Sequence, residues 1–219
     1  MKKAIVLLSG GLDSATTLYY SKAQGFRVSC LIFDYGQRHR KEIHQAQRIA
    51  WHAHCDYRIV RLSLPWKGSS LLDKKIPLPL NRDIITHEIP STYVPGRNII
   101  FLSFAISYAE TIGAEVVFIG ANAIDYSGYP DCRPEFYQAF QRVLKAGLKS
   151  GAEGRTIRIS TPLITKTKAQ IIKMGLKLKV PYHLTWSCYQ GGRRPCGRCD
   201  SCVLRQRGFE AVRREDPLL

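Results

Sequence analysis

The sequence predicts a doubly wound, mostly parallel α/β sheet, and two observations support this fold. The short, unbroken apolar run at residues 4–8 and the largely apolar segments at residues 27–33 and 116–120 are typical of strands that are buried on both faces. Segments with helical periodicity separate these runs, and strands that alternate with helices build a parallel sheet. The 219 residues suffice for one well-packed domain with an appendage.

The first half of the chain contains three strands and two helices in alternation. A helix is expected from Ser14 to residue 23, because Gly25 follows as a stop signal. A second helix is expected at residues 40–54, where apolar side chains recur on one face. The alternating segment 57–64 is expected to be a strand.

The second half continues the alternation after a long irregular segment. Residues 65–95 are rich in Pro and Ser and longer than an ordinary connection, which indicates an active-site cover or a partner surface. Arg97 then stands at the start of a helix, either facing an anion or serving as a structural cap. Helices are expected at residues 98–112, 135–147 and 166–177, and strands at residues 116–120 and 156–161.

The segment Ser9–Ser14, with the sequence SGGLDS, joins the first strand to the first helix. Two adjacent glycines remove the Cβ atoms that would keep a phosphate away from the backbone amides. Ser9 and Ser14 add hydroxyl donors, and Thr16 and Thr17 extend them into the first helical turn. The lysine of a Walker-type loop is absent here. We therefore expect a different kind of phosphate-binding loop.

Composition limits the classes of protein that fit. The net charge of +16 indicates either a polyanionic partner such as RNA or a phosphate-rich active site with a solvated surface. No recognition motif accompanies the charge, so nucleic acid is not an expected partner, although the charge leaves an RNA contact open. Because no run of about 20 apolar residues exists, we expect a cytoplasmic protein without a membrane contact.

A polar, aromatic loop follows the strand at residues 116–120 and has the composition of a substrate pocket. A carboxylate accepts two parallel hydrogen bonds from a heterocycle, and an arginine binds a carboxylate in bidentate fashion. Asp125, Asp131 and Arg133 are the candidates, although an ordinary turn uses the same residue types. Lys168 lies near the start of a later helix, where the macrodipole disfavours a cation, so it is either paired with a bound anion or simply exposed.

Four of the seven cysteines, Cys188, Cys196, Cys199 and Cys202, lie close together near the carboxyl terminus. Two-residue spacers let successive thiolates reach one ion, and four sulfur ligands suit tetrahedral Zn²⁺ in a closed structural site. An iron–sulfur cluster or free thiols are the alternatives. The complete fold prediction is therefore a doubly wound, mostly parallel sheet with a zinc-bound carboxyl-terminal tail.

Six motifs together resemble those of the 7-cyano-7-deazaguanine synthase family of the ATP pyrophosphatase superfamily. They are LSGGLDS at residues 8–14, DYGQRH at 34–39, VPGRN at 94–98, DYSGYPDCRPEF at 125–136, TWSCY at 185–189 and CGRCDSC at 196–202. The resemblance implies an adenine nucleotide alpha hydrolase-like ATP pyrophosphatase domain at residues 1–184. A zinc-binding carboxyl-terminal segment is expected at residues 185–219.

The resemblance also implies the reaction, in which 7-carboxy-7-deazaguanine and ammonia are converted to a nitrile by an ATP-dependent ligase, through an amide. Asp131 is expected to bind the guanine-like edge, Arg133 the carboxylate, and Lys168 an anion. Mg²⁺ is expected to shield the phosphates, and a second copy of the chain is expected as partner in a homodimer. The residues expected to bind ATP are Leu8, Ser9, Gly10, Gly11, Leu12, Asp13, Ser14, Ala15, Thr16, Thr17 and Leu18.

Two other functions are compatible with the same sequence. One is a tRNA-modifying enzyme of the same superfamily that adenylates a base for thiolation or amine attachment. The other is a non-catalytic RNA-binding protein with a zinc knuckle and a basic tail. In that protein the phosphates would be bound by Arg193, Arg194, Arg198, Arg205 and Arg207.

Overall fold

A computed structural model describes residues 1–81, 89–122 and 129–219. Its centre is a parallel sheet of five strands in the order β3-β2-β1-β4-β5. The central strand β1 pairs with β2 on one side and with β4 on the other. The strands are β1 Lys3–Leu7, β2 Arg27–Asp34, β3 Asp56–Arg61, β4 Val116–Phe118 and β5 Arg158–Ser160.

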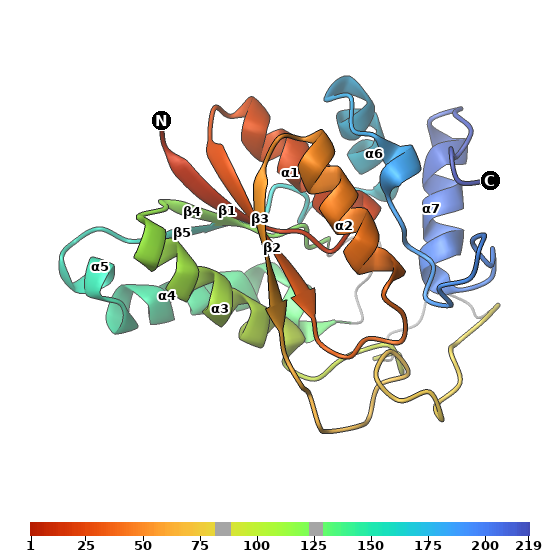
Figure 1. Cartoon of the computed structure of the whole chain (residues 1–219), viewed down its shortest axis with the longest axis horizontal. Coiled ribbons are helices and arrows are strands. Elements are labelled where there is room, and N and C mark those ends of the chain that lie inside the picture. The colour runs from red at the N-terminus through yellow and green to blue at the C-terminus, as the bar shows by residue number, and fades with distance from the viewer. Residues whose placement is uncertain (82–88, 123–128) are drawn as a thin grey trace.

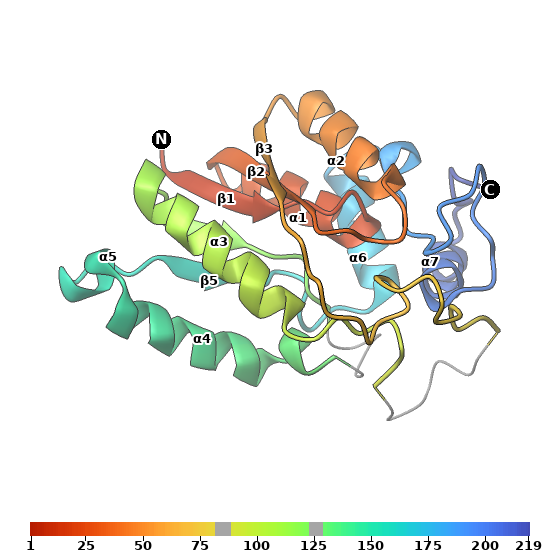
Figure 2. The same cartoon turned by 60° about the horizontal axis from the view of Figure 1, so that its bottom comes forward.

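Helices cover both faces of the sheet, as Figures 1 and 2 show, so the doubly wound prediction is confirmed. On one face lie α1 Leu12–Ala23, α2 Lys41–His52, α6 Lys168–Lys177 and α7 Asp200–Ala211; on the other lie α3 Arg97–Ile112 and α4 Pro134–Gly147. The short helix α5 Lys149–Ala152 follows α4, and 3₁₀ turns span Pro130–Cys132 and Tyr182–Leu184.

The alternation of side chains along β1 explains this arrangement. Ala4 and Val6 point into the core formed with α1, α2 and α6, whereas Ile5 and Leu7 point into the core formed with α3 and α4. Successive side chains of a strand point to opposite faces, so an unbroken apolar run is needed where both faces are covered. The apolar run at residues 4–8 therefore reflects a central, doubly covered strand.

The elements differ from the predicted ranges mainly at their ends. β3 ends at Arg61 and β4 at Phe118, so the chain leaves the sheet two or three residues earlier than expected. The last predicted helix begins at Lys168, because Thr167 is its N-cap and forms a capping box with Gln170.

The order of the strands determines where a ligand can bind. The chain adds β2 and then β3 on one side of β1, and it adds β4 and then β5 on the other side. The direction in which strands are added therefore reverses beside β1. In open α/β sheets the ligand crevice lies outside the carboxyl ends of the strands at such a point. The SGGLDS segment lies there, between β1 and α1.

Candidate active site

A cavity of about 310 Å³ lies at the carboxyl ends of β1, β2 and β4. The loop after β1 forms one wall, and the end of β2 and the start of α3 form another. The segment after β3 contributes Leu71, so part of the predicted cover segment does reach the cavity. Polar or aromatic residues that line it include Ser9, Asp13, Ser14, Tyr35, Arg38, His39, Glu42, Arg97, Asn98, Tyr129 and Trp186.

The loop between β1 and α1 is held in one shape by its own serines. The Ser9 hydroxyl donates to the Ser14 hydroxyl over 3.0 Å and accepts the Gly11 N–H over 3.3 Å. The Ser14 hydroxyl also accepts the Ser9 N–H over 3.2 Å and donates to the Gly11 carbonyl oxygen over 3.1 Å. Because the N-cap Gly11 gives α1 no side-chain cap, the first amides of α1 remain available to an anion.

Gly10 is required at its position for two reasons. Its φ of +87° lies in the left-handed region, and a Cβ built there would lie 2.2 Å from the Glu42 carbonyl oxygen. The loop thus packs directly on the first turn of α2. This close approach explains why the sequence needs glycine here.

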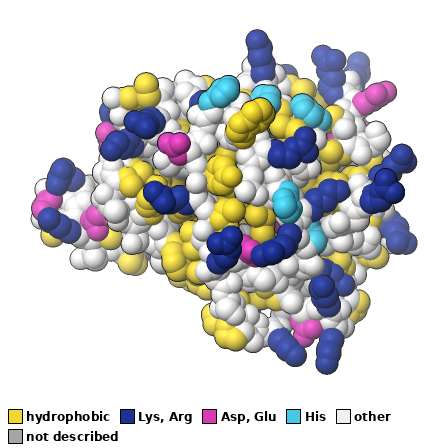
Figure 3. Space-filling view, in the orientation of Figure 1, with side chains coloured by type: hydrophobic (Ala, Val, Ile, Leu, Met, Phe, Trp, Pro, Cys, Tyr) yellow, Lys and Arg dark blue, Asp and Glu magenta, His cyan; other side chains and the backbone are white. Residues whose placement is uncertain are grey.

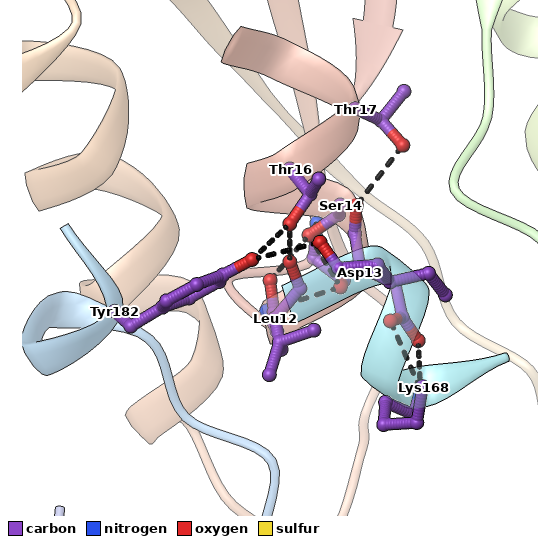
Figure 4. A network of polar contacts seen from close by, with 10 residues as sticks. Leu12, Asp13, Ser14, Thr16, Thr17, Lys168 and Tyr182 are labelled. Carbon is purple, nitrogen blue, oxygen red and sulfur yellow. Dashed lines mark hydrogen bonds and ion pairs between the residues drawn. The ribbon is translucent and has the colours of Figure 1, made fainter. Parts of the chain in front are cut away.

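Lys168 and Asp13 face each other across the loop, as Figure 4 shows. The Lys168 ammonium donates to both carboxylate oxygens of Asp13, over 2.9 and 2.8 Å. Two segments that are 155 residues apart are joined here. Lys168 was predicted to pair with a bound anion. In this structure its anionic partner is the carboxylate of Asp13.

The second half of the predicted nucleotide segment lies inside α1 and away from the cavity. Thr16 and Thr17 are fully buried, and their hydroxyls donate to the carbonyl oxygens of Leu12 and Asp13. Thr16 also contacts the Tyr182 hydroxyl over 2.9 Å, as Figure 4 shows. Ala15 and Leu18 are part of the hydrophobic core. These four residues shape the helix that carries the loop, and they do not line the cavity.

Neither Asp131 nor Arg133, two of the predicted substrate residues, is among the residues that line the cavity. Asp131 is buried, and its carboxylate accepts the main-chain N–H of Asn98 over 3.1 Å. Burial raises the pKa of this carboxyl, while the Asn98 N–H and the nearby Arg97 oppose the shift. Arg133 is exposed at the N-cap position of α4 and is not part of the cavity lining. Asp125 lies outside the described residues.

Several residues of the cavity were not candidates from the sequence. Glu42, in the first turn of α2, faces the cavity, and burial raises the pKa of its carboxyl to about 7. Tyr35, the residue directly after β2, has a raised pKa for the same reason. Trp186 comes from the segment before the cysteines and is nearly fully buried. Tyr35 and Trp186 lie inside the motifs DYGQRH and TWSCY, which were the available sequence signal, whereas Glu42 lies in no such motif.

The four cysteines form a compact cluster, which confirms that they can bind one metal ion. Their sulfur atoms all lie within 4.8 Å of one another, and those of Cys196 and Cys202 are 3.9 Å apart. A tetrahedral ion with four sulfur ligands separates the sulfur atoms by about 3.8 Å. The N–H groups of Arg198 and Cys199 both donate to the Cys196 sulfur, which favours a thiolate there.

The closeness of the thiols also changes their pKa values. A hydrogen bond with Cys199 lowers the pKa of Cys188, and hydrogen bonding to Cys188 raises the pKa of Cys199 to about 12. Four sulfur atoms at this spacing cannot all be deprotonated without a cation between them. The donor set therefore fits a structural metal ion of the closed type.

The surface is strongly basic. Figure 3 shows Lys and Arg side chains over much of the visible face, with few Asp or Glu side chains between them. Arg205, predicted in the RNA-binding alternative to bind phosphates, is instead buried and forms a bidentate pair with Asp216 over 2.6 and 2.8 Å. Within the described residues, no helix is long and apolar enough to cross a membrane.

Comparisons with known proteins agree with one another. The family model described as "Queuosine biosynthesis protein QueC" matches residues 3–213. A protein of Thermoplasma acidophilum named 7-cyano-7-deazaguanine synthase is 53% identical over 219 residues, covering 99% of this chain and 91% of its own length. A protein of the same name from Trichormus variabilis is 53% identical, covering 99% of this chain and 97% of its own.

Among solved structures, the similarity is confined to the fold. NMN synthetase from Francisella tularensis superposes with a TM-score of 0.52 at 12% identity, over 98% of this chain and 78% of that one. A U34-tRNA thiolase from Methanococcus maripaludis has a TM-score of 0.50 at 18% identity, over 96% of this chain and 65% of that one. Only the architecture carries over at such identities.

Proposed function

Because this chain belongs to the family described as queuosine biosynthesis protein QueC, we propose that it is a 7-cyano-7-deazaguanine synthase. The proposed reaction converts 7-carboxy-7-deazaguanine and ammonia to the nitrile by ATP-dependent activation. The observation that carries the proposal is the cavity itself, in which the uncapped amino end of α1 and the buried start of α3 face one space. An anion-binding loop and a pocket for an organic acid meet there.

The chemistry explains why such an enzyme needs ATP. A carboxylate is a poor electrophile, so one of its oxygens first attacks the α-phosphorus of ATP, and pyrophosphate leaves. Ammonia then attacks the acyl carbon, a C–N bond forms, and AMP leaves with the oxygen. Activation of the amide oxygen by a second ATP permits loss of AMP to give the nitrile. The protein must hold the phosphates and align the acid for each attack.

The loop from Leu8 to Ser14 is proposed to hold the phosphates. The first turn of α1 has no side-chain cap, so its main-chain N–H groups are available to an anion, and the Ser9 and Ser14 hydroxyls lie 3.0 Å apart in the same loop, which supports this role. Asp13 provides the one carboxylate of this loop, and it would hold Mg²⁺. The ion would neutralise part of the charge on the phosphates. Lys168, whose ammonium lies 2.8 Å from the Asp13 carboxylate, is proposed to pair with a phosphate instead when Asp13 binds the ion.

Zn²⁺ is the metal proposed for Cys188, Cys196, Cys199 and Cys202, since four clustered sulfur ligands at tetrahedral spacing, three of them on buried cysteines, suit it. We propose that it fastens the segment 185–219 to the domain 1–184. The homodimer stays a prediction. The contacts of Asp131 and Arg133 with the substrate stay predictions as well.

The direct test is an incubation of the purified protein with ATP, ammonium and 7-carboxy-7-deazaguanine, followed by mass spectrometry. We expect the nitrile together with AMP and pyrophosphate, at a rate that falls at least about 100-fold in Asp13→Asn. Asp56→Asn is the matched control, because Asp56 is exposed on the edge strand β3 and far from the loop. Failure of the unaltered protein to form the nitrile would contradict the proposed function.

A further inference from the structure

The cavity holds two cationic side chains, and they have different surroundings. Among the described residues that line it, Arg38 and Arg97 are the only lysines or arginines. The Arg38 guanidinium donates to the carbonyl oxygens of Ser70 and Ile76, over 3.0 and 3.2 Å. Arg38 is therefore occupied in holding the segment after β3 against the cavity.

The guanidinium of Arg97 makes fewer hydrogen bonds than that of Arg38. Its guanidinium donates to the Tyr35 hydroxyl over 3.3 Å, and no Asp or Glu of the described residues forms an ion pair with it. The nearby Asp131 carboxylate accepts the Asn98 N–H instead. A guanidinium carries five N–H donors in a planar fork that matches a carboxylate. Arg97 is thus a charged, partly buried group whose fork is not filled by these partners.

The backbone directs Arg97 into the cavity. Gly96 has a φ of 64°, and this left-handed residue turns the chain so that α3 begins at Arg97. Val94, just before the turn, is buried and anchors the segment in the core with α3. The main-chain position of Arg97 is therefore set by a helix start and a packed turn.

We propose that Arg97 binds the carboxylate of the organic acid before it is activated, and so selects an acid over a neutral analogue. The inference rests on the proposed function and assigns to Arg97 the role that the sequence predicts for Arg133. An ionised carboxylate is both the form that pairs with guanidinium and the form whose oxygen attacks phosphorus. The pair forms only in the acid half of the reaction, because the amide intermediate carries no charge.

The two halves of the reaction supply the test. Arg97→Gln and Arg97→Lys are assayed with 7-carboxy-7-deazaguanine and, separately, with the corresponding amide, each with saturating ATP. We expect Arg97→Gln to lower kcat/KM for the acid about 100-fold, mainly through KM, and that for the amide by less than about 5-fold. Arg97→Lys keeps the charge without the fork and is expected to lose about 10-fold on the acid alone.

Arg142→Gln on α4 is the matched control, since Arg142 is exposed and outside the cavity. Equal losses for acid and amide in both Arg97 variants would overturn the inference, and so would an acid-selective loss in Arg133→Gln with none in Arg97→Gln. If Arg97→Gln does not fold, Arg97→Lys decides by the same comparison. An unaltered protein that converts neither compound would refute the proposed function, and the inference would fall with it.

Discussion

The main-chain N–H of Trp186 donates a hydrogen bond of 2.8 Å to the carbonyl oxygen of Gly10. This bond joins the proposed phosphate loop to the chain that enters the four-cysteine cluster two residues later. The Trp186 indole N–H donates to the Cys188 carbonyl oxygen, and the Lys41 ammonium lies 3.3 Å from the centre of a Trp186 ring. The cluster is therefore linked to the loop through a buried tryptophan.

Removal of the metal is expected to weaken nucleotide binding as well as loosen the tail. Without an ion, four thiols at this spacing repel or reprotonate, and Trp186 loses its anchor beside Gly10. We expect chelation to raise the Kd of a non-hydrolysable ATP analogue at least about 10-fold and to expose residues 186–204 to protease. Calorimetry and limited proteolysis measure both effects.

Cys199→Ser should reproduce the effects of chelation, and Cys55→Ser is its control, because Cys55 lies outside the cluster. Unchanged affinity and protection in the metal-free protein would contradict the link between the two sites.

Replacing Gly10 by alanine should destabilise the protein more than replacing Gly36. Both residues have positive φ, +87° and +81°, so each substitution costs about 1 kcal/mol or more in backbone strain. A Cβ on Gly10 also meets the Glu42 carbonyl oxygen, whereas a Cβ on Gly36 meets nothing within 4 Å. Urea unfolding is expected to give losses of about 3 kcal/mol for Gly10→Ala and about 1 kcal/mol for Gly36→Ala. Equal losses would mean that the loop does not pack on α2 as described.

Lys168→Gln should impair the two halves of the reaction alike. Lys168 contacts the loop that holds the phosphates in both activations, so kcat/KM should fall at least about 100-fold for the acid and for the amide. This pattern differs from the acid-selective loss expected for Arg97. Lys173→Gln, exposed on the same helix α6, is the control. A loss confined to one substrate would argue against a role at the phosphates.

Glu42→Gln should stabilise the protein, and more at pH 8 than at pH 5. Burial raises the pKa of Glu42 to about 7 from 4.5; Arg97 opposes this rise and Cys188 adds to it. The folded state therefore binds more protons than the unfolded state between these values, so the stability contributed by Glu42 falls as the pH rises from about 4.5 to 7.

Glutamine resembles the protonated carboxyl and does not ionise, so its gain over glutamate is expected to be small at pH 5 and up to about 3 kcal/mol at pH 8. Urea unfolding at the two pH values measures this difference. A gain that does not depend on pH would contradict the raised pKa of the Glu42 carboxyl.

Local pattern was sufficient to predict the alternation of strands and helices and the compact cysteine cluster, because each depends on near neighbours in the chain. The capping box at Thr167 and Gln170 also has a local sequence pattern, a threonine followed three residues later by glutamine. Matches over nearly the full chain to relatives named as synthases do not favour the tRNA-modifying alternative.

Contacts between distant segments could not be predicted in the same way. Trp186 lies far in sequence from Gly10, and Glu42 has the sequence pattern of an ordinary acidic residue in a first helical turn. Arg97 was a candidate for an anion, but only the fold reveals that it shares a cavity with Ser9 and that Arg133 does not. Burial and cavity lining are properties of the folded chain, so local pattern could not distinguish these two arginines.

The most direct measurement follows the oxygen atoms of the acid. The acid, with both carboxylate oxygens replaced by ¹⁸O, is converted in the presence of ATP and ammonium, and AMP is analysed by mass. If the cavity activates the acid and then the amide at the α-phosphorus, each AMP formed carries one ¹⁸O atom and pyrophosphate carries none. Label in inorganic phosphate, or AMP without label, would contradict activation at this loop.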